Sequence, residues 1–85
     1  MKHASWYKQI ADEAKRKELE KADTLAREIV EENEEEIATL AAKGKYRAEF
    51  AIRPQNVGLI VTQLYKQNGY TAGYDGKVVT VIWGD

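Results

Sequence analysis

The chain has 85 residues and no cysteine, and its 13 Lys and Arg against 14 Asp and Glu give a formal net charge of −1. This length indicates one domain whose core alone gives marginal stability, and the missing cysteines exclude disulfides, thiolate metal sites and a cysteine nucleophile. The nearly balanced charge argues against the basic surface of an electrostatically driven nucleic-acid binder.

Long apolar runs are missing from the sequence. No run reaches the roughly eighteen residues needed to cross a membrane, and no short apolar core follows a basic start as in a secretory signal. We therefore expect a cytoplasmic protein without a membrane partner, which gains additional burial by forming a homo-oligomer.

Residues 4–43 predict one long helix, or two helices end to end, because they lack Gly and Pro and are rich in Ala, Glu, Lys and Leu. Forty helical residues would span about 60 Å, whereas a domain of this size has a radius of gyration of roughly 12 Å. Part of the helix must therefore overhang the fold. We divide the chain into a charged amphipathic helix, residues 1–43, with a possible bend near residues 15–18, and a small domain, residues 44–85, within one cooperative unit.

Apolar residues on this helix occur at spacings of three and four and predict contacts with a second subunit or another partner. Asn33 lies within the stripe, where it either fixes the register of a coiled coil or points to solvent at the stripe's edge. The acidic residues at 31–36 fan out around the helix and indicate a solvated face rather than a metal site. The residues expected at the contacts are Trp6, Tyr7, Ile10, Leu19, Leu25, Ile29 and Asn33.

Gly44 is expected to end the helix. Residues 46–53 then alternate between apolar and charged and predict a strand that ends at Pro54. Asn56 is expected to cap a second helix, which stops at Gly69. Gly58 in its first turn weakens this helix, which suggests that another group packs closely there.

The end of the chain predicts a hairpin of residues 70–74 and 77–83 around a type I′ turn at Asp75-Gly76. A right-handed crossover would place the last strand between the other two and antiparallel to both. The fold class is therefore α+β: a long helix followed by a β-α-β-β unit, with a three-stranded mixed sheet packed on a helix. One sheet face should meet the second helix, and the other is a candidate contact surface. The face expected to meet the helix carries Tyr70, Ala72, Tyr74, Val79, Val81 and Trp83.

Several local motifs resemble those of a loose class of small proteins encoded by tailed bacteriophages. They are the helix end Ile37-Ala38-x-Leu40, the entry Gly44-Lys45-Tyr46, the helix end Leu64-x-x-x-x-Gly69-Tyr70 and the strand Val79-x-Val81-Ile82-Trp83. The resemblance covers roughly residues 30–84. It implies a viral anti-defence protein that acts as an inhibitor, binding a host protein, a component of antiviral defence or a signalling nucleotide.

Residues suited to catalysis are scarce. His3 is the only histidine and lies near the start of the chain, and Ser5, the only serine, is expected to cap the long helix. Arg47, Arg53, Tyr65 and Tyr74 are candidates for holding phosphates and bases, although aromatic residues on a core-facing strand also serve for packing. We therefore expect a non-enzymatic, self-associating interaction protein without a cofactor or metal. A single-stranded nucleic-acid binder is the alternative.

Overall fold

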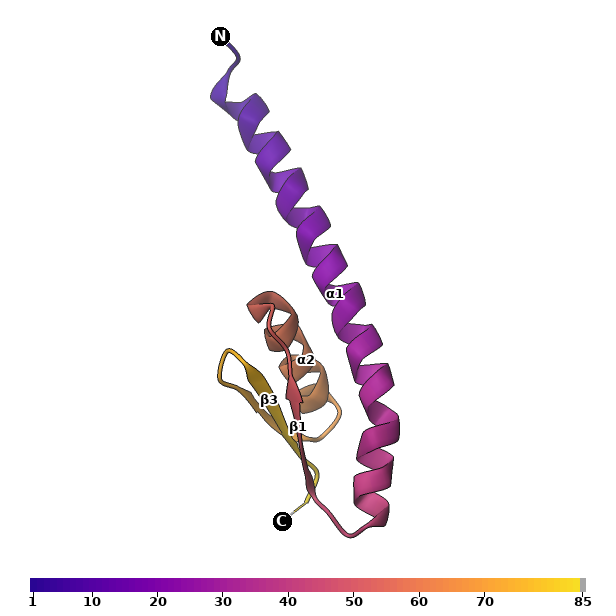
Figure 1. Cartoon of the computed structure of the whole chain (residues 1–85). Helices are drawn as coiled ribbons and strands as arrows, with labels where there is room; N and C mark the ends of the chain where they lie inside the picture. Colours follow the sequence, from indigo (N-terminus) through magenta and orange to yellow (C-terminus); the bar gives the residue numbers. More distant parts are fainter. Residues whose placement is uncertain (85) are drawn as a thin grey trace.

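The computed structural model describes residues 1–84 and contains two helices and one three-stranded sheet (Figure 1). This composition confirms the α+β prediction. The elements in chain order are α1 (Ala4–Ala42), β1 (Arg47–Ala51), α2 (Gln55–Gln67), β2 (Thr71–Tyr74) and β3 (Val78–Ile82).

Helix α1 is a single helix that continues without interruption through residues 15–18. Its N-cap is His3, whose Nδ1 accepts a hydrogen bond of 3.1 Å from the backbone N–H of Ser5. The expected cap at Ser5 was therefore wrong, because Ser5 already lies inside the first turn. At the other end Gly44 has a φ of 79°, which confirms it as the residue that stops the helix.

The first half of α1 projects beyond the rest of the molecule (Figure 1). The molecule measures 64 × 21 × 20 Å, and every residue from 1 to 21 is exposed. Burial on α1 begins at Ala22, where the helix meets α2. We call residues 4–21 the overhang; its presence confirms that the helix is longer than the domain that it packs on.

Helix α2 lies between α1 and the sheet, and α1 touches the sheet only at β1. The side chains of Ala26, Val61, Val79 and Val81 are fully buried. They bring together three layers: α1, α2 and the inner face of β3. The second half of α1 is thus part of the core, and the overhang is not.

The strands lie in the order β1-β3-β2, and β3 is antiparallel to both neighbours. The central position of β3 is as predicted. The sheet is nevertheless antiparallel rather than mixed, because β1 and β2, which run in the same direction, are not hydrogen-bonded to each other.

The hairpin turn lies one residue further along the chain than predicted. Tyr74 pairs with Val79, and Asp75 N–H donates to the carbonyl of Val78, so Gly76 and Lys77 are the central residues. Gly76 has a φ of 98° and Lys77 does not have a positive φ, which excludes type I′. Asp75 Oδ1 accepts hydrogen bonds from the N–H groups of Lys77 and Val78, which hold this loop closed.

Helix α2 begins at Gln55 with Pro54 at the N-cap, so the expected cap at Asn56 was wrong. Pro54 suits this place because its fixed φ is compatible with a helix start. The expected close packing at Gly58 is present, since a Cβ at this position would lie 2.4 Å from Cζ of Tyr74.

Candidate interaction surface

The overhang carries an exposed patch of large apolar side chains near its N-terminal end. Trp6, Tyr7 and Ile10 are 43%, 57% and 49% exposed. The rings of Trp6 and Tyr7 pack edge to face with their centroids 5.1 Å apart, and Lys2 Nζ lies 3.8 Å from the centroid of the Trp6 ring. Exposed Trp and Tyr side chains are typical of residues that dominate protein–protein binding.

This patch does not continue the stripe by which α1 packs on α2. At 3.6 residues per turn, Tyr7, Ile10 and Ala14 lie roughly a third of a turn around the helix from Ala22 and Ala26. The patch therefore points in a different direction from the α1–α2 contact. Its side chains need a surface that α2 does not provide.

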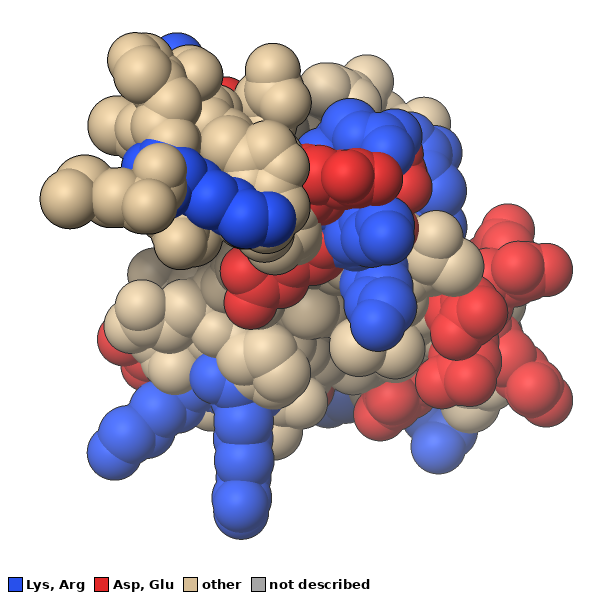
Figure 2. Space-filling model, turned by 90° about the horizontal axis from the view of Figure 1, so that it is seen from above, with Lys and Arg blue, Asp and Glu red and all other residues tan. Residues whose placement is uncertain are grey.

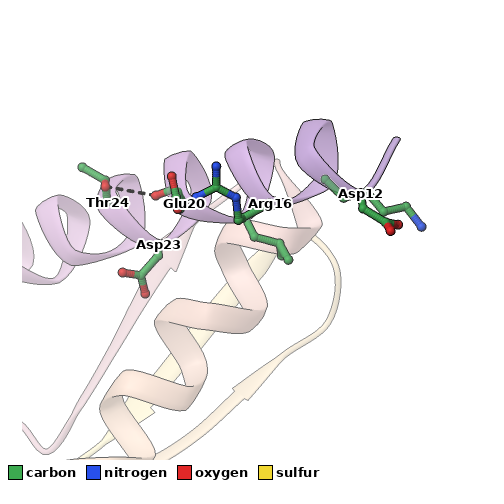
Figure 3. A pocket seen from close by; sticks show the side chains of 7 residues that line it. Asp12, Arg16, Glu20, Asp23 and Thr24 are labelled. Carbon is green, nitrogen blue, oxygen red and sulfur yellow. Dashed lines mark hydrogen bonds and ion pairs between the residues drawn. The ribbon is translucent and has the colours of Figure 1, made fainter. Parts of the chain in front are cut away.

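A shallow hollow lies along residues 12–24 of α1, mostly on the overhang (Figure 3). Every residue that lines it belongs to α1, and its charged groups are partly paired along the helix. Arg16 Nη1 lies 3.1 Å from Glu20 Oε1, and the Thr24 hydroxyl donates to the carbonyl of Glu20. This hollow is an exposed helix surface rather than an enclosed site.

A deeper groove of about 470 Å³ lies between α1 and β1, and we call it the α1–β1 groove. Its lining combines apolar side chains from both elements with carboxylates. Leu25 in this groove is 42% exposed. The lining residues include Leu25, Ile29, Glu32, Glu36, Glu49 and Arg53. An apolar surface among carboxylates suits a partner that has apolar side chains and positive charge.

The structure does not gather the four predicted phosphate- and base-binding residues into one site. Arg47 begins β1 on the open face of the sheet and is ion-paired with Glu49. Arg53 follows β1 and lines the α1–β1 groove. Tyr65 is buried, and Tyr74 packs over Gly58 with its hydroxyl 2.7 Å from the carbonyl oxygen of Ile52. Both tyrosines therefore take part in packing.

The predicted contact residues on α1 fall into two groups. Leu19 and Leu25 are exposed, like Trp6, Tyr7 and Ile10. Ile29 packs against the core, and Asn33 is half-buried. Asn33 thus does not point freely to solvent, and the stripe in which it lies packs on α2 of the same chain. Its role in fixing the register of a coiled coil stays a prediction.

Two buried polar atoms lie where α1 packs on α2. Asn33 Nδ2 and Tyr65 Oη have no hydrogen-bond partner among residues 1–84. Burial raises the pKa of the Tyr65 phenol above its ordinary value of 10.0, and the nearby Asn33 amide offsets part of this rise. The amide is therefore close to the phenol without making a hydrogen bond of ordinary geometry.

Replacing Tyr65 by phenylalanine should therefore not destabilise the protein at pH 7, and should stabilise it by up to about 1 kcal/mol. Because its pKa is raised in the folded chain, Tyr65 ionises more readily after unfolding, so wild-type stability should fall as pH rises above 10. The variant should lose less stability over this range. Urea midpoints at pH 7 and pH 10.5 measure both effects, and Tyr46→Phe at an exposed tyrosine is the control. A clear loss at pH 7 would show that the hydroxyl is hydrogen-bonded.

A smaller cleft of about 220 Å³ opens beside Tyr65 and Tyr70, with Val30 and Glu34 on its α1 side. Small-molecule pockets usually have volumes of about 300–1,000 Å³. This cleft is below that range, and Glu34 in its lining would repel a phosphate.

The open face of the sheet carries Val78, Thr80 and Ile82 on β3, each half-buried. The longer side chains of β1 on the same face are those of Arg47 and Glu49. The strand aromatics Phe50 and Tyr74 point to the opposite, helix-covered face. Within the part of the chain that the structure describes, this face therefore lacks the aromatic platform on which bases stack.

None of the His, Asp and Glu side chains of residues 1–84 form a group of three or more that could hold a metal ion. Neither helix of this region is both long and apolar enough to span a membrane.

Comparisons with protein-family models, with curated proteins and with solved structures find no match. The resemblance to phage proteins therefore stays a prediction.

Proposed function

We propose that this protein is a non-enzymatic interaction protein that associates with itself through the overhang and binds another macromolecule. The observation that carries this proposal is the overhang itself, with every residue from 1 to 21 exposed. The overhang, with its unpartnered Trp-Tyr-Ile patch, does not pack on the domain and therefore adds nothing to its stability. It is well suited to contact between chains.

Surface area supports the same proposal. The chain exposes 6539 Å², whereas a folded monomer of this mass exposes about 5,100 Å². The excess is about 1,400 Å², and a stable protein interface takes about 800 Å² from each partner. Association through the overhang could therefore bury the excess surface.

The target that we propose is a host protein or a protein component of antiviral defence, which this protein would inhibit by occupying it. The separation of Arg47, Arg53, Tyr65 and Tyr74 favours a protein target over a signalling nucleotide or single-stranded nucleic acid. Thermal melting with a panel of nucleotides distinguishes the classes, because a ligand at 100 times its Kd stabilises by about 2.7 kcal/mol. A rise in Tm with one nucleotide would favour the nucleotide alternative.

Replacing Trp6, Tyr7 and Ile10 together by glutamine should abolish self-association and leave the domain folded. Glutamine keeps the helix propensity while removing the apolar patch, and exposed substitutions usually change stability by no more than about 0.5 kcal/mol. Light scattering gives the solution mass, and circular dichroism gives the unfolding transition of the domain.

The matched control is Leu59→Gln, which removes an apolar side chain that is 61% exposed on α2. It should leave the solution mass of the wild type unchanged. A wild-type protein that is monomeric at all concentrations, or a triple variant that associates as well as the wild type, would contradict self-association through the overhang.

A further inference from the structure

One continuous face of α1 carries three different kinds of side chain in sequence. From the N-terminal end of the helix, this face carries first the apolar side chains of the patch and then two lysines. Leu25 follows the lysines, and two glutamates follow Leu25. The spacings of three and four residues keep these side chains on one side of the helix, and all of them are exposed. We call this the second face of α1; its members are Tyr7, Ile10, Ala14, Lys17, Lys21, Leu25, Glu28 and Glu32.

The charges of α1 are separated along its length. Residues 1–21 contain six Lys and Arg against four Asp and Glu, whereas residues 22–43 contain two against seven. Residues 1–21 therefore carry +2 and residues 22–43 carry −5. Figure 2 shows Asp and Glu side chains gathered at one edge of the molecule, beside a group of Lys and Arg nearer its middle.

From this pattern we infer that two copies of the chain pair with their α1 helices antiparallel, each overhang lying along the acidic half of the other. This inference rests on the proposed self-association and adds its direction and its contact surface. Parallel pairing would place like charges side by side along the whole helix, which is unfavourable. Antiparallel pairing places the overhang of one copy against the acidic half of the other at both ends of a two-fold interface.

The second face of α1 is self-complementary when Leu25 lies next to the two-fold axis. Lys21 then faces Glu28 of the second copy, and Lys17 faces Glu32 of the second copy. By symmetry each of these pairs occurs twice. The interface thus has an apolar centre with two ion pairs on either side.

The α1–β1 groove provides the rest of the contact. Glu32 and Glu36 of α1 and Glu49 of β1 give its lining acidic groups next to the apolar Leu25 and Ile29. The second copy's overhang, with Ala14, Lys17 and Lys21, brings small apolar and basic side chains to this lining. Its Trp6 and Tyr7 extend further, toward Tyr46, which is 54% exposed after the end of α1. In the dimer the second copy's overhang therefore covers the α1–β1 groove, and its apolar patch reaches the end of α1 near Tyr46.

Charge reversal tests the direction of pairing. Lys17→Glu with Lys21→Glu should weaken the dimer by about tenfold or more, because four ion pairs become four repulsions. Reversing all four positions, with Glu28→Lys and Glu32→Lys added, restores each pair and should return the dissociation constant to near its wild-type value. In a parallel dimer the fourfold variant would bring no recovery over the double variant, and this outcome would overturn the inference. These side chains are exposed, so the domain should stay folded throughout.

Disulfide trapping gives an independent answer, because the chain has no cysteine of its own. Under oxidation Leu25→Cys should form a covalent dimer, since the two copies of this position meet near the axis. Ile10→Cys alone should not, because its two copies lie at opposite ends of the antiparallel pair. Efficient cross-linking of Ile10→Cys to itself would overturn the antiparallel arrangement while leaving self-association intact. A wild-type protein that is monomeric by light scattering would instead contradict the proposed function.

Discussion

Replacing Gly58 by alanine is expected to lower the free energy of unfolding by about 2–3 kcal/mol, although alanine is the better helix former by roughly 1 kcal/mol. A Cβ at this position would lie 2.4, 2.6 and 2.7 Å from three ring atoms of Tyr74. The ring cannot simply turn aside, because its hydroxyl lies within hydrogen-bond distance of the carbonyls of Ile52 and Gly76, at 2.7 and 3.0 Å. The new methyl group therefore either strains the ring or breaks its link to the β1 end and the hairpin loop.

The matched control is Gly73→Ala in β2. No atom of the described residues lies within 4 Å of a Cβ built at Gly73, other than its own neighbours, and its φ is not positive. Alanine there should be neutral or slightly stabilising, since it restricts the unfolded chain. Urea denaturation of the two variants gives the comparison. Equal losses at the two positions would contradict a specific contact at Gly58.

A double-mutant cycle with Tyr74→Ala separates the contact from other effects of the substitution. Once the ring is removed, Gly58→Ala should become neutral or stabilise the protein by up to about 1 kcal/mol through helix propensity. A change of sign between the two backgrounds is the expected result. An unchanged loss in the Tyr74→Ala background would mean that the helix backbone, rather than the tyrosine ring, requires glycine.

The sheet shows which features of this fold could be predicted from sequence. The predicted turn at Asp75-Gly76 paired Tyr74 with Lys77, whereas the structure pairs it with Val79. This error of two residues left every side chain on its predicted face, because side chains alternate with a period of two. The buried Val79 and Val81 were therefore assigned correctly even though their partners were not.

The extent of the overhang could not be predicted from the stripe on α1. Leu19 continues the spacing of Ala22 and Ala26, yet it is 61% exposed while they are buried. The difference arises because burial on α1 depends on where α2 begins, and α2 begins at Gln55. Nothing in the residues of α1 encodes this boundary.

The candidate binding residues failed to converge for a related reason. Tyr65 and Tyr74 have the chemistry of a base-stacking platform, but the same rings also fill a core. Which use they serve depends on whether another helix covers them. Helix α2 covers Tyr74, and Tyr65, which belongs to α2, is buried against α1. The sequence could propose these residues, whereas only the packing of α2 decides between the two uses.

Replacing Ala26 by aspartate is expected to cost about 3 kcal/mol or more, because an ionised carboxylate would be buried without a partner. Ala26 is fully buried where α1 packs on α2, and the side chain of aspartate is too short to reach water along the helix. A chain of this length has a total stability of roughly 4–13 kcal/mol. The stability lost in Ala26→Asp would thus be a large part of the total stability, and thermal melting should show it as a lower Tm.

The control for helix propensity is Ala38→Asp, at an exposed position in the same half of α1. It should lower stability by no more than about 0.7 kcal/mol, which is the intrinsic difference between alanine and aspartate. Lowering the pH to about 4 should recover part of the stability lost in Ala26→Asp, since a neutral carboxyl is less costly to bury. It should have little effect on the difference in stability between Ala38→Asp and the wild type. If the two variants melt alike, α1 does not pack on α2 in solution. The boundary between packed helix and overhang, on which the antiparallel dimer depends, would then have to be abandoned.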